Sequence, residues 1–223
     1  MAGLHNSTTP PNSPPSADEK VPPKGLEIFI QQRATRFVAK IICWSAALAE
    51  IAIVLAYQKP HLPLSQYILS NLVFSGNAEK VRPTIPFFAA TFTMVLGSYI
   101  RWCCYRALGD LFTFEMSIRR NHRLVMRGPY VVVRHPAYAG LILTVGGFVS
   151  WHASPGSWAR ECGVFQTTAG KLIAYGYVGP VSIVTVALLA RMSKEDAMLK
   201  RKFGAQWDEW ARRVPYMLIP GIY

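Results

Sequence analysis

The chain has 223 residues, 51% of them hydrophobic, with a mean hydropathy of +0.20 and a formal net charge of +12. This combination excludes an ordinary soluble domain and indicates a small basic membrane protein.

The first 24 residues differ from the rest of the chain. They contain six prolines together with Ser, Thr and Asn, and no apolar run precedes Leu26. Such a segment buries too little surface to offset the entropy that ordering costs. We therefore predict a disordered tail over residues 1–24 and a membrane domain over residues 25–223. Because the tail lacks the apolar core of a signal peptide, no cleaved leader is expected.

Four apolar runs approach the roughly 20 residues that a helix needs to cross a bilayer. They are Phe37 to Tyr57, Ile85 to Ile100 continuing towards Tyr105, Tyr138 to Trp151 with the segment before it, and Leu172 to Ala190. The shorter piece from Leu62 to Phe74 is predicted to be interfacial, although a hairpin with its neighbour would raise the span count. The expected fold is an all-α bundle of about four to five membrane spans.

Positive charge is unevenly distributed between the loops. Of the 24 lysines and arginines, 19 lie in the N-terminal segment, the segment after the second span and the C-terminal segment. The positive-inside rule then places both termini and residues 106–134 in the cytosol. Arg119, Arg120 and residues 200–202 are expected to attract anionic lipid headgroups, at about 1 kcal/mol per cation. Membrane lipids, and not nucleic acid, are the partners that this charge predicts.

The third span is preceded by Arg134, His135 and Pro136. Proline disfavours helix at the residue before it and is tolerated as the first residue of a helix. His135 is therefore expected at the mouth of a helix whose free amides suit a polar or anionic ligand. A histidine at the level of the lipid headgroups is an equally good interpretation.

Arg191 and Glu195 stand four residues apart at the end of the last span, so a continuing helix shows both on one face. Arg before Glu is the poorer order for a helical ion pair, which favours the two side chains facing ligands rather than each other. A surface ion pair is the alternative. Further on, an apolar stripe with two tryptophans predicts an interfacial C-terminal helix with a possible break at Gly204.

Glu50 lies inside the first span, where an ionised carboxylate costs about 2.5–3.5 kcal/mol. We expect it to face the bundle, where it contacts substrate, pairs with Arg101 or stays protonated. The spacing of histidines and cysteines predicts no metal site and no disulfide.

Two stretches resemble the isoprenylcysteine carboxyl methyltransferase family of integral membrane enzymes. They are "NHRLVMRGPYVVVRHPAYAG" at Asn121 to Gly140 and "RMSKEDAMLKRKFGAQWDEWARRVP" at Arg191 to Pro215. The first is similar to the family's H-x-L-V, G-x-Y and R-H-P-S-Y-x-G patterns, and the second to R-x-x-x-E-E, F-G and R-V-P. The likeness covers roughly the C-terminal half of the chain. Asp196 replaces the second Glu of the family pattern, and Ala137 replaces the Ser.

The resemblance implies S-adenosyl-L-methionine as methyl donor and the C-terminal carboxylate of a prenylated cysteine as acceptor, at the cytosolic face of the endoplasmic reticulum. It implies catalytic roles for Arg191 and Glu195, with Arg191 binding the substrate carboxylate. The cofactor residues that it implies are Glu115, His122, Arg123, Leu124, Val125, Tyr130, His135, Pro136, Ala137, Tyr138 and Glu195.

Other functions stay open on the sequence. The low span count for a eukaryotic member leaves room for a small prenylated thiol acid or a phospholipid amine as acceptor. A membrane adaptor without enzymatic activity and a redox enzyme of sterol metabolism are further alternatives. The chain has no G-x-G-x-x-G motif, which excludes a soluble Rossmann methyltransferase.

Overall fold

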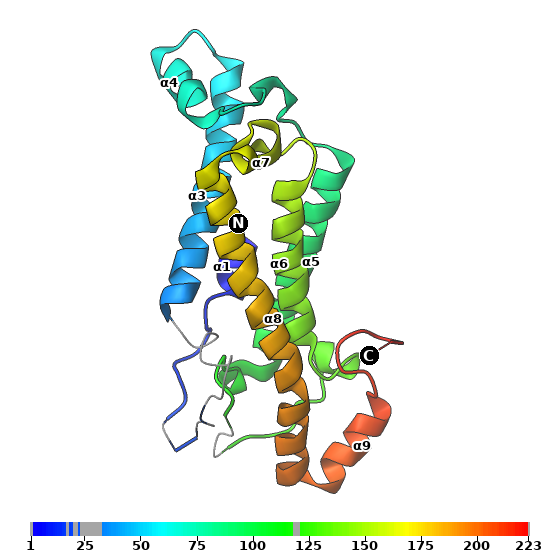
Figure 1. Cartoon of the computed structure of the whole chain (residues 1–223). Helices are drawn as coiled ribbons and strands as arrows, with labels where there is room; N and C mark the ends of the chain where they lie inside the picture. Colours follow the sequence, from blue (N-terminus) through cyan, green and yellow to red (C-terminus); the bar gives the residue numbers. More distant parts are fainter. Residues whose placement is uncertain (1, 17, 20–21, 23–32, 118–120, 223) are drawn as a thin grey trace. The chain divides into compact units, whose positions relative to one another are not determined.

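A computed structural model describes residues 2–16, 18–19, 22, 33–117 and 121–222 (Figure 1). The helices are α1 (Ala2–Ser7), α3 (Arg33–Gln58), α4 (Pro63–Leu72), α5 (Ile85–Leu108), α6 (Pro136–Ala153), α7 (Trp158–Glu161), α8 (Thr168–Phe203) and α9 (Ala205–Arg213). Short 3-10 turns lie at η1 (Ala78–Lys80), η2 (Gly109–Leu111), η3 (Gly128–Val131) and η4 (Val164–Gln166). These residues contain no β-strand, which confirms the all-α prediction. Arg119, Arg120 and part of the predicted tail lie outside the described residues.

Within the described residues, three helical stretches are long and apolar enough to cross a membrane. They are Phe37–Gln58 in α3, Ile85–Leu111 containing α5, and Thr168–Phe203, which is α8. Helix α6 has 18 residues, just under the length of about 20 that a span needs. Helix α4 has only 10 residues and is about 15 Å long, half the thickness of the hydrocarbon core, so it cannot cross. The predicted membrane helix bundle is confirmed, and its orientation stays a prediction.

The helices divide into two compact units, each with its own core. The first unit consists of residues 36–94 and 145–181, and the second of residues 2–35, 95–144 and 182–223. Helices α5, α6 and α8 each contribute one part to the first unit and another to the second. All of the predicted site residues belong to the second unit.

Polar groups buried in the first unit bond to one another. Glu50 of α3 is 7% exposed, and its carboxylate accepts a hydrogen bond of 3.4 Å from the backbone N–H of Trp158. The indole of Trp158 donates to the carbonyl of Leu72 at 2.9 Å. Arg101, which one interpretation paired with Glu50, makes its described hydrogen bonds with Ala137 and Tyr105. Glu50 therefore helps to fix the start of α7.

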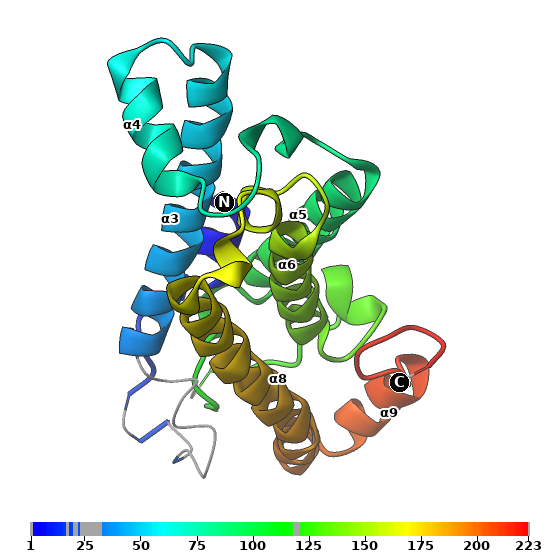
Figure 2. The same ribbon diagram turned by 45° about the horizontal axis from the view of Figure 1, so that its top comes forward.

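Close approach of α5 and α6 in the second unit depends on glycine. A Cβ atom placed on Gly97 would lie 2.5 Å from the carbonyl oxygen of Gly140 and from the backbone nitrogen of Thr144. A Cβ atom on Gly140 would in turn lie 2.8 Å from the carbonyl oxygen of Gly97. Both views show the two helices running side by side (Figures 1 and 2). This contact sets the distance between α5 and the mouth of α6.

Replacing Gly97 by Ala is therefore expected to lower the free energy of unfolding by about 1–3 kcal/mol, because backbone atoms must move apart. The measurement is a denaturation titration of the purified chain in detergent. Gly146→Ala is the matched control, since no atom lies within 4 Å of a Cβ there and alanine favours helix. Equal stability of the two variants would contradict the packing argument.

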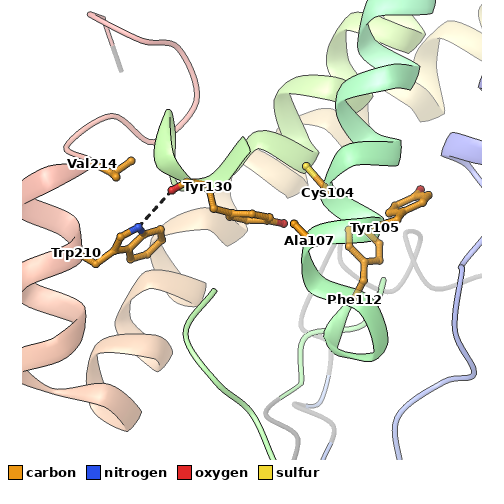
Figure 3. Packing of buried hydrophobic residues seen from close by; sticks show 7 residues of the cluster. All are labelled: Cys104, Tyr105, Ala107, Phe112, Tyr130, Trp210 and Val214. Carbon is orange, nitrogen blue, oxygen red and sulfur yellow. Dashed lines mark hydrogen bonds between the residues drawn. The ribbon is translucent and has the colours of Figure 1, made fainter. Parts of the chain in front are cut away.

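Helix α8 ends where the sequence predicted a break. Gly204 adopts φ +52°, a conformation that L side chains rarely take, and α9 begins at the next residue. Trp210 of α9 belongs to the apolar stripe from which an interfacial helix was predicted, and its side chain faces the protein core. It is 4% exposed and packs in a core cluster with Tyr130 and Val214, where its indole donates to the Tyr130 carbonyl at 3.3 Å (Figure 3).

The described part of the N-terminal segment belongs to the second unit and contacts its helices. Leu4 of α1 is 4% exposed, and the carbonyl of Ser7 accepts a hydrogen bond of 3.0 Å from the hydroxyl of Tyr105. The side-chain amide of Asn12 donates to the carbonyls of Gly109 and Phe112 at 2.8 and 3.0 Å. The prediction of disorder considered only the surface that this segment can bury by itself. The contacts described above are instead made with other elements, α5 and η2.

Candidate active site

The loop that enters α6 is held by the end of the chain. Pro136 opens α6, as its position before an apolar run predicted. The backbone N–H groups of Arg134 and His135 donate to the carbonyls of Tyr216 and Met217 at 2.9 and 2.8 Å. The His135 side chain is 94% buried. The segment after α9 therefore fixes the backbone from which both basic side chains project.

Two adjacent carboxylates of α8 face this loop. Asp196 Oδ1 lies 3.1 Å from His135 Nε2, and Asp196 Oδ2 lies 3.2 Å from Arg134 Nε. Glu195 Oε2 lies 3.6 Å from His135 Nδ1. The imidazole ring also stacks on Tyr138, with ring centroids 5.6 Å apart and planes at 19°. The histidine at the mouth of α6 thus sits between two carboxylates.

Arg191 and Glu195 form an ion pair, so the expectation that they would face ligands rather than each other is wrong. Arg191 Nε lies 2.7 Å from Glu195 Oε1, and the two side chains are 6% and 21% exposed. At this degree of burial, leaving either charge unpaired costs more free energy than the unfavourable order of Arg before Glu along the helix. Arg191 Nη1 also donates to the carbonyl of Phe114 at 2.8 Å, and the Tyr138 hydroxyl donates to Glu195 Oε1 at 2.6 Å.

Tyr130 of η3 lies in the hydrophobic cluster beside Cys104, Phe112 and Trp210 (Figure 3). Burial, reinforced by the neighbouring Cys104, raises the pKa of the Tyr130 phenol well above its ordinary value. The hydroxyl therefore stays protonated at neutral pH and can donate a hydrogen bond.

The remaining predicted cofactor residues have different surroundings, and two of them pack against this cluster. Leu124 and Val125 pack against it, and the His122 ring lies 6.0 Å from the ring of Phe203. Arg123 is exposed. Glu115 is half-buried, and its backbone carbonyl accepts a hydrogen bond from the hydroxyl of Thr113. Among the predicted residues, contacts thus join His135, Tyr138, Arg191 and Glu195 directly.

Sequence reasoning missed two residues of this group. Asp196 was noted only as a departure from the family pattern, yet it pairs with both Arg134 and His135. Arg134 was noted only as part of the motif. The available signals were two adjacent acidic residues after one span and an Arg-His pair before another. Neither pattern shows that the acidic residues contact the Arg-His pair.

Comparison with known proteins bears on this arrangement. Residues 89–154 match the isoprenylcysteine carboxyl methyltransferase (ICMT) family, and a protein-S-isoprenylcysteine O-methyltransferase B from Arabidopsis thaliana is 30% identical over 152 residues. The chain belongs to the ICMT family. The matched part of the Arabidopsis relative is 67% of this chain and 66% of that protein.

Other relatives share less of their length with this ICMT family member. A probable protein-S-isoprenylcysteine O-methyltransferase from Oryza sativa is 25% identical over 123 residues, 54% of each chain. A Delta(14)-sterol reductase from Mus musculus is 30% identical over 104 residues, 46% of this chain and 20% of that protein. The chain thus spans from a fifth to about two thirds of the length of these relatives.

The family match has a definite place in the fold. Residues 89–154 include most of α5, the turn η3 and all of α6. The ICMT match therefore contains the loop with Arg134 and His135. Glu195 and Asp196 of α8 lie beyond it, and they join this loop through the contacts described above.

Proposed function

We propose that the chain is an S-adenosylmethionine-dependent enzyme that methylates the C-terminal carboxylate of a prenylated cysteine at the cytosolic face of a membrane. The observation that carries the proposal is the meeting of His135, from the family-matched loop, with Glu195 and its partner Arg191 in α8. The names of the Arabidopsis and rice relatives support the reaction class.

The residues at this meeting point fit a cationic cofactor. S-adenosylmethionine supplies, when bound, a methyl group on a positively charged sulfur, to be transferred to a carboxylate oxygen while the carbon–sulfur electron pair stays on sulfur. Glu195 pairs with Arg191 through Oε1, and its Oε2 offers a carboxylate oxygen that attracts such a cation. The stacked rings of His135 and Tyr138 offer a flat surface for a nucleobase. Tyr130, Leu124 and Val125 extend this surface from the neighbouring cluster.

The reaction requires little from the protein beyond the positioning of the two reactants. A carboxylate is already ionised at neutral pH, so the reaction needs no general base. The residues act by holding the two reactants in line and by excluding water. Arg191, fixed at 2.7 Å from Glu195 and at 2.8 Å from the Phe114 carbonyl, offers a rigid cation beside the proposed cofactor position.

The proposed location follows from the same chemistry. A water-soluble cofactor and a lipid-linked acid meet only where cytosol and hydrocarbon touch. Arg134 and the basic end of α8 belong to the segments that the positive-inside rule assigns to the cytosol. We therefore propose that both termini lie in the cytosol. The membrane that we propose is that of the endoplasmic reticulum. Insertion of glycosylation acceptors after Gln58 and after Phe203 tests this orientation, because only the first is expected to be modified.

A direct assay tests the function. Purified chain in lipid vesicles receives methyl-labelled S-adenosylmethionine together with N-acetyl-S-farnesylcysteine, and the expected product is a base-labile methyl ester. A phosphatidylethanolamine arm in the same preparation tests the phospholipid amine alternative. An adaptor that only binds lipid would show no saturable cofactor binding in either arm.

The likeness to a sterol reductase supports one other candidate, a nicotinamide-dependent reduction of a sterol double bond. This likeness covers 20% of the mouse protein, which leaves most of the reductase without a counterpart in the match. A nicotinamide-dependent loss of sterol unsaturation, with no methyl incorporation, would favour it over methyl transfer.

A further inference from the structure

Arg101 is a buried cation of α5 that the site described above does not use. It is 4% exposed and lies within the apolar stretch Ile85–Leu111. A charged side chain costs about 2.5–3.5 kcal/mol at the centre of a membrane helix, and one that is buried towards the end of a span is still normally paired with an opposite charge or marks a path for a polar ligand. The position of Arg101 therefore raises the question of what balances its charge.

The described contacts of Arg101 are all with neutral groups. Its Nε donates to the Tyr105 hydroxyl at 3.2 Å, and its Nη1 donates to the Ala137 carbonyl at 2.8 Å. The rings of Tyr105, Phe112 and Phe114 lie 5.4, 5.8 and 5.5 Å from its Cζ. Among the described residues, no carboxylate lies within ion-pair distance of Arg101 and none bonds to its Nη2. A guanidinium has five N–H donors, so donors remain for a ligand.

Two residues place Arg101 next to the site. The ring of Phe114 packs on Arg101, while the Phe114 carbonyl accepts the hydrogen bond from Arg191. Ala137, which binds Arg101, is followed by Tyr138, whose hydroxyl donates to Glu195. Arg191 itself is already neutralised by Glu195 at 2.7 Å. Of these two arginines, Arg101 is the one that has no carboxylate partner among the described residues.

We propose that Arg101 binds the carboxylate of the prenylated cysteine and makes the site select the free acid over its ester. This inference rests on the proposed function. A guanidinium held among aromatic rings with donors free suits a carboxylate, which it can bind through two parallel hydrogen bonds. Methyl transfer forms an oxygen–carbon bond on that carboxylate and breaks the carbon–sulfur bond of the donor, whose electron pair stays on sulfur. The carboxylate thereby loses its charge. The neutral ester then loses the contact with Arg101, which favours product release.

The test compares binding of N-acetyl-S-farnesylcysteine with binding of its methyl ester to the full chain in detergent. Wild type is expected to prefer the acid by roughly 10- to 100-fold, the range of one charge-assisted contact. Arg101→Gln should bind both within about threefold of each other, with the ester affinity unchanged. Arg101→Met packs among the three rings and provides the same comparison if the Gln variant fails to fold.

Arg106→Gln is the matched control, because Arg106 lies on the same helix, is exposed and packs its guanidinium on the ring of Trp102. It should keep the preference for the acid. If Arg101→Gln keeps that preference while Arg191→Gln loses it, Arg101 only joins α5 to α6 and the inference is overturned. If wild type binds neither compound, the proposed function itself fails, and the two failures are thereby distinguished.

Discussion

Replacement of Glu195 by Gln is expected to reduce methyl transfer by roughly 100-fold or more and to lower the free energy of unfolding by about 2–3 kcal/mol. Glu195 is contacted by Arg191, Tyr138 and His135, so the loss of its charge leaves a buried guanidinium without its partner. Initial rates with the labelled cofactor and denaturation in detergent measure the two effects.

A double replacement separates stability from catalysis. When both members of a buried ion pair become apolar residues of similar volume, stability is often regained. Arg191→Met combined with Glu195→Met should therefore unfold within about 1 kcal/mol of wild type while methyl transfer stays lost. Full activity of the double variant would contradict any catalytic role of the pair.

The matched control is another pair of the same spacing. Glu209 and Arg213 stand four residues apart on α9, with N–O contact at 2.6 Å, and their side chains are 58% and 65% exposed. Exposed pairs contribute about 0–1 kcal/mol, so Glu209→Gln with Arg213→Met should change neither stability nor rate appreciably. Sequence spacing is the same in both pairs, and the exposed pair has the more favourable order of Glu before Arg, so a larger effect at Arg191 and Glu195 is attributed to their burial.

The helices themselves could be predicted from local patterns. Apolar runs of span length predicted α3, α5 and α8, the residue Pro136 predicted the start of α6, and Gly204 predicted the break between α8 and α9. Each of these features depends on residues close together in the chain. Hydrophobicity and backbone restriction act at that range, so the sequence alone is sufficient.

The pairing of charges could not be predicted in the same way. The rule for helix order disfavoured an ion pair between Arg191 and Glu195, yet burial against Phe114 and Tyr138 outweighs it. The partners of Asp196 come from the loop before α6, far away in the chain. A single sequence does not state which of several basic residues meets which acid, because tertiary packing decides it.

Trp210 shows the same limit for apolar residues. An apolar stripe with tryptophans is typical both of a membrane interface and of a helix that covers a protein core. The choice depends on what faces the stripe, and here it is Tyr130 and the end of α5 (Figure 3). Helix α9 therefore supports the cluster that carries Tyr130, which connects the C-terminal segment to the proposed cofactor surface.

Replacement of His135 by Ala is expected to weaken cofactor affinity by roughly 10- to 100-fold. The imidazole lies between the carboxylates of Glu195 and Asp196 and stacks on Tyr138, so its removal takes away a contact of both carboxylates and one of the two rings of the flat surface. Titration of S-adenosylhomocysteine into the purified chain in detergent gives the affinity directly. His61→Ala, at an exposed histidine between α3 and α4, is the matched control and should bind as wild type does. Unchanged affinity in the His135 variant would show that the start of α6 is not part of the cofactor site. Within the described part of the chain, no other residue of the loop before α6 contacts both carboxylates of α8.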